Sequence, residues 1–247
     1  MNEEYIAGRN PVLEALRSNR EINKIWIAEG VQKNHMQQII QLAKRAGIMI
    51  QYVPNQKIDQ LTTERHQGVV AQVAAYKYAE LEELFHIAKS REEAPFFLIL
   101  DELEDPHNLG SIMRTADAAG VHGIIIPKRR AVGLTAAVAK ASTGAIEYVP
   151  VVRVTNLTRT IEELKAQGIW VAGTDAKGNQ DYRMIDGEIP LALVIGSEGK
   201  GISRLVKEKC DFLFQLPMTG HVTSLNASVA ASLLMYEVFR KRRPLGE

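Results

Sequence analysis

The stretch LPMTGHVTSLNASVAASLLMYE, residues 216–237, carries more hydrogen-bonding side chains than the start of a helix needs. One capping oxygen from Ser, Thr, Asp or Asn satisfies a helix start. Here four polar side chains precede a run rich in Ala and Ser, namely Thr219, Thr223, Ser224 and Asn226. Helix capping therefore does not account for the whole stretch.

A second stretch, LALVIGSEGKGIS at residues 191–203, passes from a buried strand pattern into a loop with three glycines. Glycine allows a backbone to approach a ligand closely. The spacing matches neither the dinucleotide fingerprint nor the P-loop, and the serine does not stand in a G-x-S-x-G nucleophile turn. Glu198 lies in the middle of the loop, where a phosphate site would avoid negative charge. Its carboxylate favours a positively charged ligand or a guanidinium partner.

The third stretch is LDELEDPHNLGSIMRTADAAG, residues 100–120. Asn108 is a candidate helix cap, and Arg114 follows six residues later, not far from the same face. From spacing alone, the favoured interpretation is a capped helix with one solvated arginine. We interpret the four acidic residues before it as strand-end surface charge and expect no metal, because no further His or carboxylate completes a ligand set; they are Asp101, Glu102, Glu104 and Asp105.

Taken together, these three stretches closely resemble the three signature motifs of the SpoU class of RNA ribose 2′-O-methyltransferases, in the knotted SPOUT superfamily. The resemblance covers about residues 95–247 and keeps all three motifs in order. By layout, residues 1–77 resemble the small substrate-binding domain, similar in fold to certain ribosomal proteins, that many members carry. The resemblance is greatest to members that methylate the ribose of a guanosine in bacterial 23S rRNA.

The resemblance implies S-adenosylmethionine as cofactor, bound in a C-terminal trefoil knot. It places five residues at the catalytic centre, namely Asn108, Arg114, Glu198, Ser224 and Asn226. It places three more at the cofactor pocket, namely Gly196, Leu216 and Leu225. The surplus of polar groups before the last helix would then serve a site as well as a cap.

These residue types suit methyl transfer to a ribose. A sulfonium methyl is a strong electrophile, so the protein must align the 2′-oxygen and ease the loss of its proton. We expect Arg114 to orient a neighbouring phosphate and Glu198 to hold Arg114 in position, because a guanidinium stays charged and is a poor proton acceptor. The family also implies a homodimer, for which Ala227 and Ala231 offer a small-residue face.

The elements that must position these groups are those of an α/β protein. Continuous apolar runs that alternate with helical patterns predict a mainly parallel sheet with helices on both faces. The predicted strands of the second half are FFLILD, GIIIP, EYVPVV, IWVAGT, LALVIG and FLFQL. The front of the chain alternates likewise and predicts a small α/β domain with strands INKIWIA, IMIQYV and GVVAQVAAY.

Charge divides the chain into the same parts. Residues 1–77 carry a net charge of +3, residues 78–94 carry −3, and residues 95–247 carry +1. We therefore expect an RNA-binding domain at 1–77, a linker helix at 78–94 and a catalytic domain at 95–247. Basic residues such as Arg9, Arg17 and Arg20 are candidates to bind an anionic partner such as RNA.

Composition sets the remaining limits. An apolar content of 46% is ordinary for a globular protein, and no apolar run approaches the ~20 residues that span a bilayer. The one cysteine, Cys210, excludes an internal disulfide and is expected in the core. We expect a cytoplasmic protein without a membrane partner.

Three other functions compete with this interpretation. The same chemistry on a tRNA guanosine is the nearest, and the front domain favours rRNA over it. A non-catalytic RNA- or ribosome-binding protein on the same fold is the second, and the complete motif set argues against it. An NAD-binding oxidoreductase is the third, and it lacks the dinucleotide fingerprint.

Overall fold

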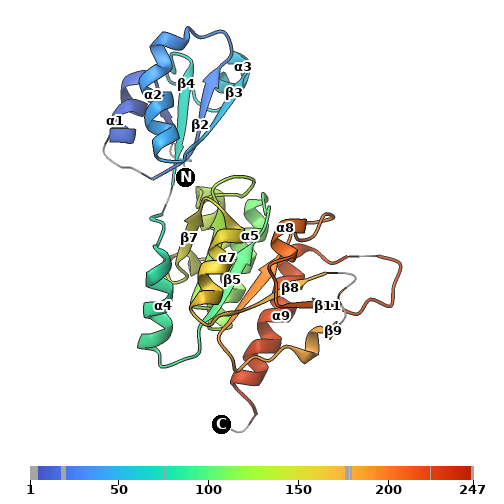
Figure 1. Ribbon diagram of the computed structural model, residues 1–247. Coiled ribbons are helices and arrows are strands. Elements are labelled where there is room, and N and C mark those ends of the chain that lie inside the picture. Colours follow the sequence, from blue (N-terminus) through green and yellow to red (C-terminus); the bar gives the residue numbers. More distant parts are fainter. Residues whose placement is uncertain are drawn as a thin grey trace. The chain divides into compact units, whose positions relative to one another are not determined.

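A computed structural model describes residues 5–17, 21–74, 76–175, 178, 180–222 and 224–245. Two of the residues considered above, Arg20 and Thr223, lie outside this part of the chain. The chain forms two compact units (Figure 1). One contains the chain up to Lys77 together with Gly133–Ala137, and the other contains Tyr78–Val132 and the chain from Val138 on.

The first unit is built on a four-stranded sheet in the order β1-β4-β2-β3, in which only β2 and β3 are parallel. Alternate residues of β2 face two small cores. Ile25 and Ile27 pack with α1 and α2, whereas Trp26 packs with Val53 and Ile58. The elements are β1 (Tyr5–Ala7), α1 (Arg9–Arg17), β2 (Ile22–Ala28), α2 (Lys33–Arg45), β3 (Met49–Val53), α3 (Asn55–Asp59) and β4 (Val69–Val73).

The second unit is built on a parallel sheet in the order β7-β6-β5-β10-β8-β11-β9. The expected parallel α/β sheet is confirmed, and each predicted strand of this half overlaps an observed one, although β7 begins only at Val151 within the predicted EYVPVV. The elements are α4 (Leu81–Ser90), β5 (Phe96–Leu100), α5 (Pro106–Ala118), β6 (Gly123–Pro127), α6 (Ala136–Ala141), β7 (Val151–Val154), α7 (Leu157–Ala166), β8 (Trp170–Thr174), β9 (Gln180–Asp181), β10 (Leu191–Ile195), α8 (Arg204–Lys207), β11 (Phe212–Gln215) and α9 (Ala227–Arg242), with 3₁₀ turns at Ala145–Glu147 and Tyr182–Met184.

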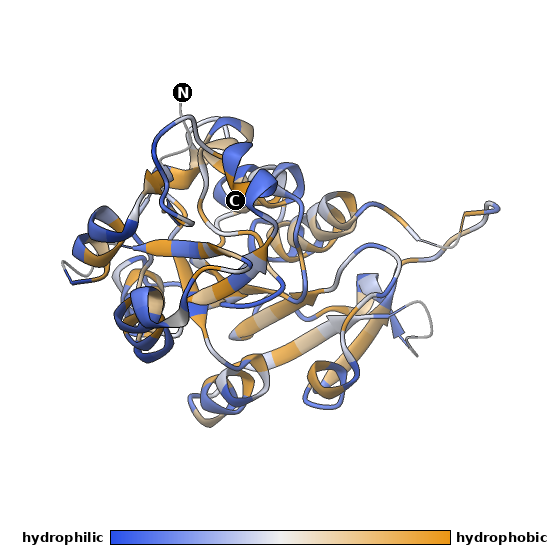
Figure 2. Ribbon diagram, turned by 90° about the horizontal axis from the view of Figure 1, so that it is seen from above, coloured by the Kyte–Doolittle hydropathy of each residue, from blue (hydrophilic) through white to orange (hydrophobic). Residues whose placement is uncertain are grey.

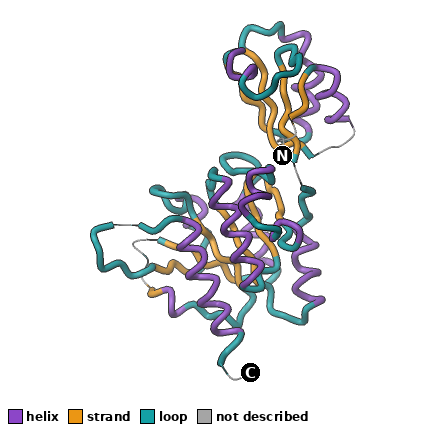
Figure 3. The backbone as a smooth tube through the Cα atoms, turned by 180° about the vertical axis from the view of Figure 1, so that it is seen from behind, coloured by secondary structure: helices purple, strands orange, loops and turns teal. Residues whose placement is uncertain are grey.

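Helices cover both faces of this sheet, as Figure 1 and the view from behind in Figure 3 show. On one face, α4, α7 and α8 pack against Phe97, Ile99 and Val194. On the other face α5 and α9 lie side by side, joined by a hydrogen bond of 3.1 Å between the hydroxyls of Thr115 and Ser232. Figure 2 shows the strands largely in orange, as burial on both faces requires.

The stretch 78–94, expected to be a linker, is integrated into the second unit. Its helix α4 buries Leu84 completely in the core. A Cβ atom on Gly123 would lie 2.1 Å from a methyl carbon of Leu84, so β6 and α4 are in close contact and a larger residue would have to displace the Leu84 side chain. The acidic face of α4 is solvated, but its apolar face belongs to the core.

The basic end of α9, RKRR at 240–243, forms hydrogen bonds and ion pairs with other residues of the second unit. Arg242 donates to the carbonyl oxygens of Ala94 at 2.6 Å and Gly187 at 2.6 Å, and it lies over the ring of Phe96. Arg243 forms an ion pair with Glu93. These contacts anchor the helix end, so the charges of Arg242 and Arg243 serve the fold of this unit.

The structure contains two short strands that were not predicted, and it shows the environment of Cys210. Strands β1 and β9 were not predicted, because β1 follows an acidic start and β9 has two residues at the sheet edge. Cys210 is half-buried just before β11, and burial, reinforced by Asp211, raises the pKa of its thiol to about 12. Among the described residues, no helix is both long and apolar enough to cross a membrane.

Candidate active site

The loop after β10 closes on itself. Ser197 and Gly201 exchange two backbone hydrogen bonds, of 3.2 and 2.9 Å. A Cβ atom on Gly196 would lie 2.1 Å from the carbonyl carbon of Gly201, so only glycine fits there. Gly199 and Gly201 have φ angles of 80° and 67°, which glycine adopts without strain. The glycines therefore close the loop and present Glu198 at its tip.

Three side chains from three separate segments meet in one hydrogen-bond network. The carboxylate oxygen Oε1 of Glu198 accepts from Nδ2 of Asn108 at 3.1 Å and from Nδ2 of Asn226 at 2.5 Å. Asn226 Nδ2 also lies 3.0 Å from Oδ1 of Asn108 and donates to it. One residue from each sequence motif thus contributes to a single cluster.

Asn226 has a second role at the start of α9. Its Oδ1 accepts from the backbone N–H of Ser228 at 2.9 Å, from the Ser228 hydroxyl at 2.6 Å and from the N–H of Val229 at 3.3 Å. The capping oxygen and the network donor are therefore the two ends of one carboxamide. The position of the helix fixes the orientation of the amide that faces Glu198.

The cap of α5 differs from the sequence prediction. Asp105, not Asn108, caps this helix by accepting from the N–H groups of His107 and Asn108 at 3.1 and 3.2 Å. Pro106 occupies the first helical position, where its missing N–H costs nothing. Asn108 is thereby left inside the first turn, buried, with its carboxamide free to join the network.

Asp101 also differs from the prediction of surface charge. It is 4% exposed, and its carboxylate accepts from the backbone N–H of Ser203 at 2.8 Å. This bond ties the end of β5 to the segment that follows the Gly196–Gly201 loop. Its place at the carboxyl end of a buried strand was the only sequence signal, and this place does not by itself distinguish a buried carboxylate from a solvated one.

Arg114 lies apart from the network. It is exposed on α5 and forms no hydrogen bond or ion pair with the described residues. Six helical residues turn through about 600°, which puts Arg114 roughly 120° around the helix from Asn108. Arg114 is thus farther from the face of Asn108 than we expected, and Glu198 binds two asparagines where we expected it to hold Arg114.

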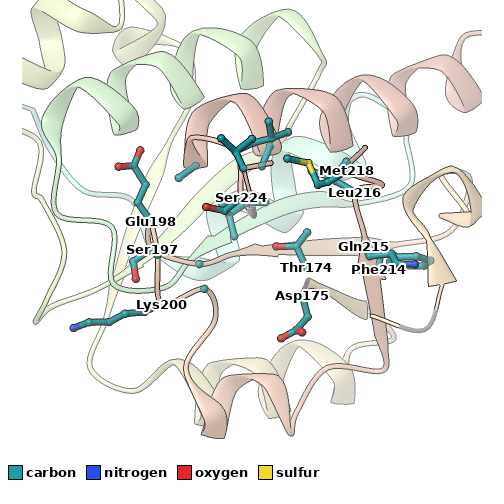
Figure 4. A pocket seen from close by; sticks show the side chains of 18 of the residues that line it. Thr174, Asp175, Ser197, Glu198, Lys200, Phe214, Gln215, Leu216, Met218 and Ser224 are labelled. Carbon is teal, nitrogen blue, oxygen red and sulfur yellow. The ribbon is translucent and has the colours of Figure 1, made fainter. Parts of the chain in front are cut away.

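A cavity of about 1000 Å³ lies beside this network, between the loops that follow β8, β10 and β11. The carboxyl ends of parallel strands are the usual place for ligands in such sheets. In Figure 4, Ser224 lies between Glu198 on one side and Leu216 and Met218 on the other. The predicted residues in its lining are Gly196, Glu198, Leu216, Ser224 and Leu225.

Sequence reasoning missed part of this lining. Thr174 ends β8 and Asp175 follows it, and Asp175 forms an ion pair with Lys207 on the cavity wall. Their position at the carboxyl end of a parallel strand was a usable signal. The loop between Thr174 and β9 carries no glycine-rich or polar pattern strong enough to single them out.

The lining suits a ligand of nucleoside size that carries positive charge. Leu216, Met218 and Leu225 supply apolar contact. Within the described part of the chain Glu198 forms no ion pair, so amide N–H groups alone stabilise its carboxylate. The same residues include no group of three or more His, Cys, Asp or Glu side chains arranged to hold a metal ion.

Comparison with known proteins accounts for both units. Residues 95–236 match the SpoU rRNA Methylase family. Residues 5–79 match the family described as RNA 2′-O ribose methyltransferase substrate binding. Together the two matches cover nearly all of the chain.

Curated relatives match over the full length. A Bacillus subtilis protein, YacO, assigned to the TrmH family of tRNA/rRNA methyltransferases, is 69% identical over 244 residues, which cover 99% of this chain and 98% of YacO. A Staphylococcus aureus protein with the same family assignment is 58% identical over 247 residues and is covered completely.

Solved structures give the same family. The SpoU methyltransferase AviRb from Streptomyces viridochromogenes, in complex with the cofactor AdoMet, matches with a TM-score of 0.62 and 27% identity over 98% of this chain and 91% of its own. An AdoMet-bound rRNA methyltransferase from Sinorhizobium meliloti matches with a TM-score of 0.60 and 27% identity, over 96% of this chain and 87% of its own. A TrmH/SpoU tRNA modifying enzyme from A. aeolicus matches with a TM-score of 0.55 and 27% identity, over only 66% of this chain and 85% of its own.

Proposed function

Because the chain belongs to the SpoU family of S-adenosylmethionine-dependent RNA methyltransferases, we propose that it methylates the 2′-hydroxyl of a ribose in RNA. The observation that carries this proposal is the Asn108–Glu198–Asn226 network at the edge of a nucleoside-sized cavity. The cavity residues fit the cofactor, since Leu216, Met218 and Leu225 offer apolar contact. The Glu198 carboxylate, which has no ion-pair partner among the described residues, complements a cation.

The cofactor supplies a methyl group on a positively charged sulfonium. We assign its binding to Gly196, Leu216 and Leu225, with contacts made largely by backbone groups. The Gly196–Gly201 loop has no room for a side chain at Gly196, which supports this assignment. The carboxylate of Glu198 would favour the cation by electrostatic attraction.

The remaining residues would position the RNA. Ser224, which is exposed and lines the cavity, would hydrogen-bond the ribose. Asn108 and Asn226 bind the Glu198 carboxylate and would hold it at the edge of the same cavity. Arg114 is exposed and uncommitted among the described residues, which suits a guanidinium that binds an RNA phosphate. Its part would be to orient the nucleotide, not to accept the proton.

We propose a guanosine of 23S rRNA as the target, with a tRNA guanosine as the alternative. The first unit supports rRNA, because the rRNA methyltransferase of S. meliloti matches both units, whereas the tRNA modifying enzyme of A. aeolicus matches about the length of one. Residues 1–77, which hold the basic excess, would bind the RNA substrate and residues 95–247 would carry out catalysis. RNA as substrate implies a cytoplasmic location.

We further propose a C-terminal trefoil knot and a homodimer. Strand order supports the knot, since β10 lies between β5 and β8 and the segment after β11 returns to the cavity beside the β10 loop. The face expected for the dimer was Ala227 and Ala231, but both are buried within the chain. The exposed face of α9 carries Val229, Leu233 and Tyr236 instead.

Those three residues stand at spacings of four and three and so share one stripe of the helix. They are 47%, 41% and 49% exposed. A second copy of the chain would cover this stripe. Sedimentation at micromolar concentration should show a dimer, and Leu233→Asp should shift it toward monomer; a wild-type monomer would contradict the proposal.

The experiment that tests the proposed function is transfer of a labelled methyl group to purified rRNA and tRNA, followed by mapping of the modified nucleotide. We expect label in one guanosine of 23S rRNA. Label in tRNA alone would select the alternative substrate. No label in either RNA, with cofactor still bound, would favour a non-catalytic RNA-binding role.

A further inference from the structure

A second cavity, of about 470 Å³, opens within the first unit between α1, α2 and the turn before β4. Its volume falls in the range of about 300–1,000 Å³ that is typical of small-ligand sites. Two apolar side chains, Leu13 and the buried Ile39, form part of the lining. The polar lining residues are Arg9, Asn10, Asn34, His35, Gln37, Gln38 and Gln67.

Most of these polar side chains are carboxamides. A carboxamide offers both donors and an acceptor, and the edge of a nucleobase also presents both. A phosphate group presents acceptors only, so a phosphate site would be lined by Lys and Arg, whereas Arg9 is the one residue of those two types in this lining. No carboxylate lines the cavity, so a polyanion can approach it.

One carboxamide is held at the cavity by a strained turn. Gln67 has a φ angle of 51°, in the left-handed region that few side chains adopt. The turn is fixed by His66, whose Nδ1 accepts from the N–H of Gly68 at 3.0 Å and whose Nε2 lies 2.9 Å from Asp59. The Oε1 atom of Gln67 accepts from the N–H of Arg9 at 3.3 Å. Strain of this kind is concentrated at binding sites.

We propose that this cavity receives one unpaired nucleobase of the substrate RNA, so that the first unit recognises an unstacked nucleotide in addition to the phosphate backbone. The proposal rests on the proposed function, in which RNA is the substrate. Carboxamides around the rim hydrogen-bond the edge of the base, while Leu13 and Ile39 contact it through apolar atoms. Unstacked bases in loops and bulges are the usual sequence-specific targets in RNA.

The test compares single-stranded with duplex RNA on the full-length protein. The probes are poly(A), poly(C) and poly(U) as single strands and poly(A)·poly(U) as duplex, measured by fluorescence anisotropy at one fixed salt concentration. The double variant Gln37→Ala/Gln38→Ala should bind its preferred single strand about 25-fold more weakly, because it loses two hydrogen bonds worth about fivefold each. Its affinity for the duplex should stay within twofold of wild type. Gln56→Ala, an exposed glutamine on α3 outside the cavity, is the matched control.

Gln67→Gly separates recognition from folding. Glycine adopts φ of 51° without strain, so the unfolding temperature should stay unchanged or rise, while single-strand affinity falls. Equal losses for single strand and duplex, or no loss in either variant, would overturn the nucleobase pocket alone. A wild-type protein that binds none of these RNAs would overturn the proposed RNA function and this proposal with it.

Discussion

The carboxamide of Asn226 binds Glu198 with one end and caps α9 with the other. Its Nδ2 lies 2.5 Å from the Glu198 carboxylate, and its Oδ1 accepts from the first N–H groups of the helix. A carboxylate side chain would cap the helix equally well but has no donor for Glu198. The asparagine therefore meets a requirement of the site and not of the helix alone.

Asn226→Asp should separate these two roles. The cap is kept, so the free energy of unfolding should change by about 1 kcal/mol or less. The lost donor and the adjacent like charge should lower methyl transfer about 100-fold. Two neighbouring carboxylates raise the pKa of one of them, so the ratio of variant to wild-type activity should recover as the pH falls. Asn226→Ala, which also loses the cap, should show no such recovery.

Gly196→Ala should abolish cofactor binding. The added methyl would lie 2.1 Å from backbone of the same loop, and backbone cannot move aside as a flexible side chain can. We expect a loss of about 1–3 kcal/mol in stability from overpacking. Calorimetry with S-adenosylmethionine measures the effect. Gly199→Asn is the control, since a Cβ there meets nothing within 4 Å and asparagine tolerates positive φ; equal loss in both variants would contradict loop closure at Gly196.

Arg114→Ala should lower methyl transfer about 100-fold and leave cofactor affinity and the unfolding temperature unchanged. Arg114 is exposed and has no partner among the described residues, so nothing in the fold depends on it. Arg159→Ala, another exposed arginine, is the matched control, although it loses an ion pair with Glu163. Normal transfer by the Arg114 variant would exclude the arginine from the site.

A fragment that begins at Tyr78 should fold and bind cofactor, whereas one that begins at Ala94 should not. The longer fragment keeps α4, whose Leu84 is fully buried in the core. Loss of a buried leucine typically costs about 3 kcal/mol, and removal of the whole helix costs more. The Tyr78 fragment should lose most RNA affinity in a gel shift across a salt series, because residues 1–77 hold the basic excess. Full RNA affinity would place recognition in the second unit.

Stability should fall below about pH 6.5 because of His122. Its side chain is fully buried, and its Nδ1 accepts from the N–H of Phe96 at 3.0 Å. Burial lowers the pKa of His122 below its ordinary value of 6.5, although the hydrogen bond to Glu93 acts to raise it. The unfolded chain thus takes up the proton at higher pH than the folded chain, and the stability present above pH 6.5 is lost as the pH drops. Urea unfolding between pH 8 and 5 should show this slope, and His122→Gln should reduce it; an unchanged slope would exclude His122.

The strands could be predicted because apolar runs are local signals, whereas the meeting of the three motifs was predicted from the family resemblance. The hydrogen-bond partners of Glu198 could not be predicted, since the direction of a side chain on α5 depends on where that helix starts. Asp105 and Pro106 shift the start by three residues relative to a cap at Asn108. The exposed stripe on α9 could not be predicted either, because Val229 and Leu233 differ from core residues only by the face of the helix on which they lie.

The most direct test of the central claim is the position of the transferred methyl group. RNA methylated by the wild-type protein with labelled S-adenosylmethionine should be hydrolysed with alkali, which needs a free 2′-hydroxyl to cleave the chain. We expect the label in dinucleotides that resist cleavage, and about 100-fold less of it after treatment with Asn226→Asp at neutral pH. Label released entirely as mononucleotides would show methylation of a base and would contradict the account.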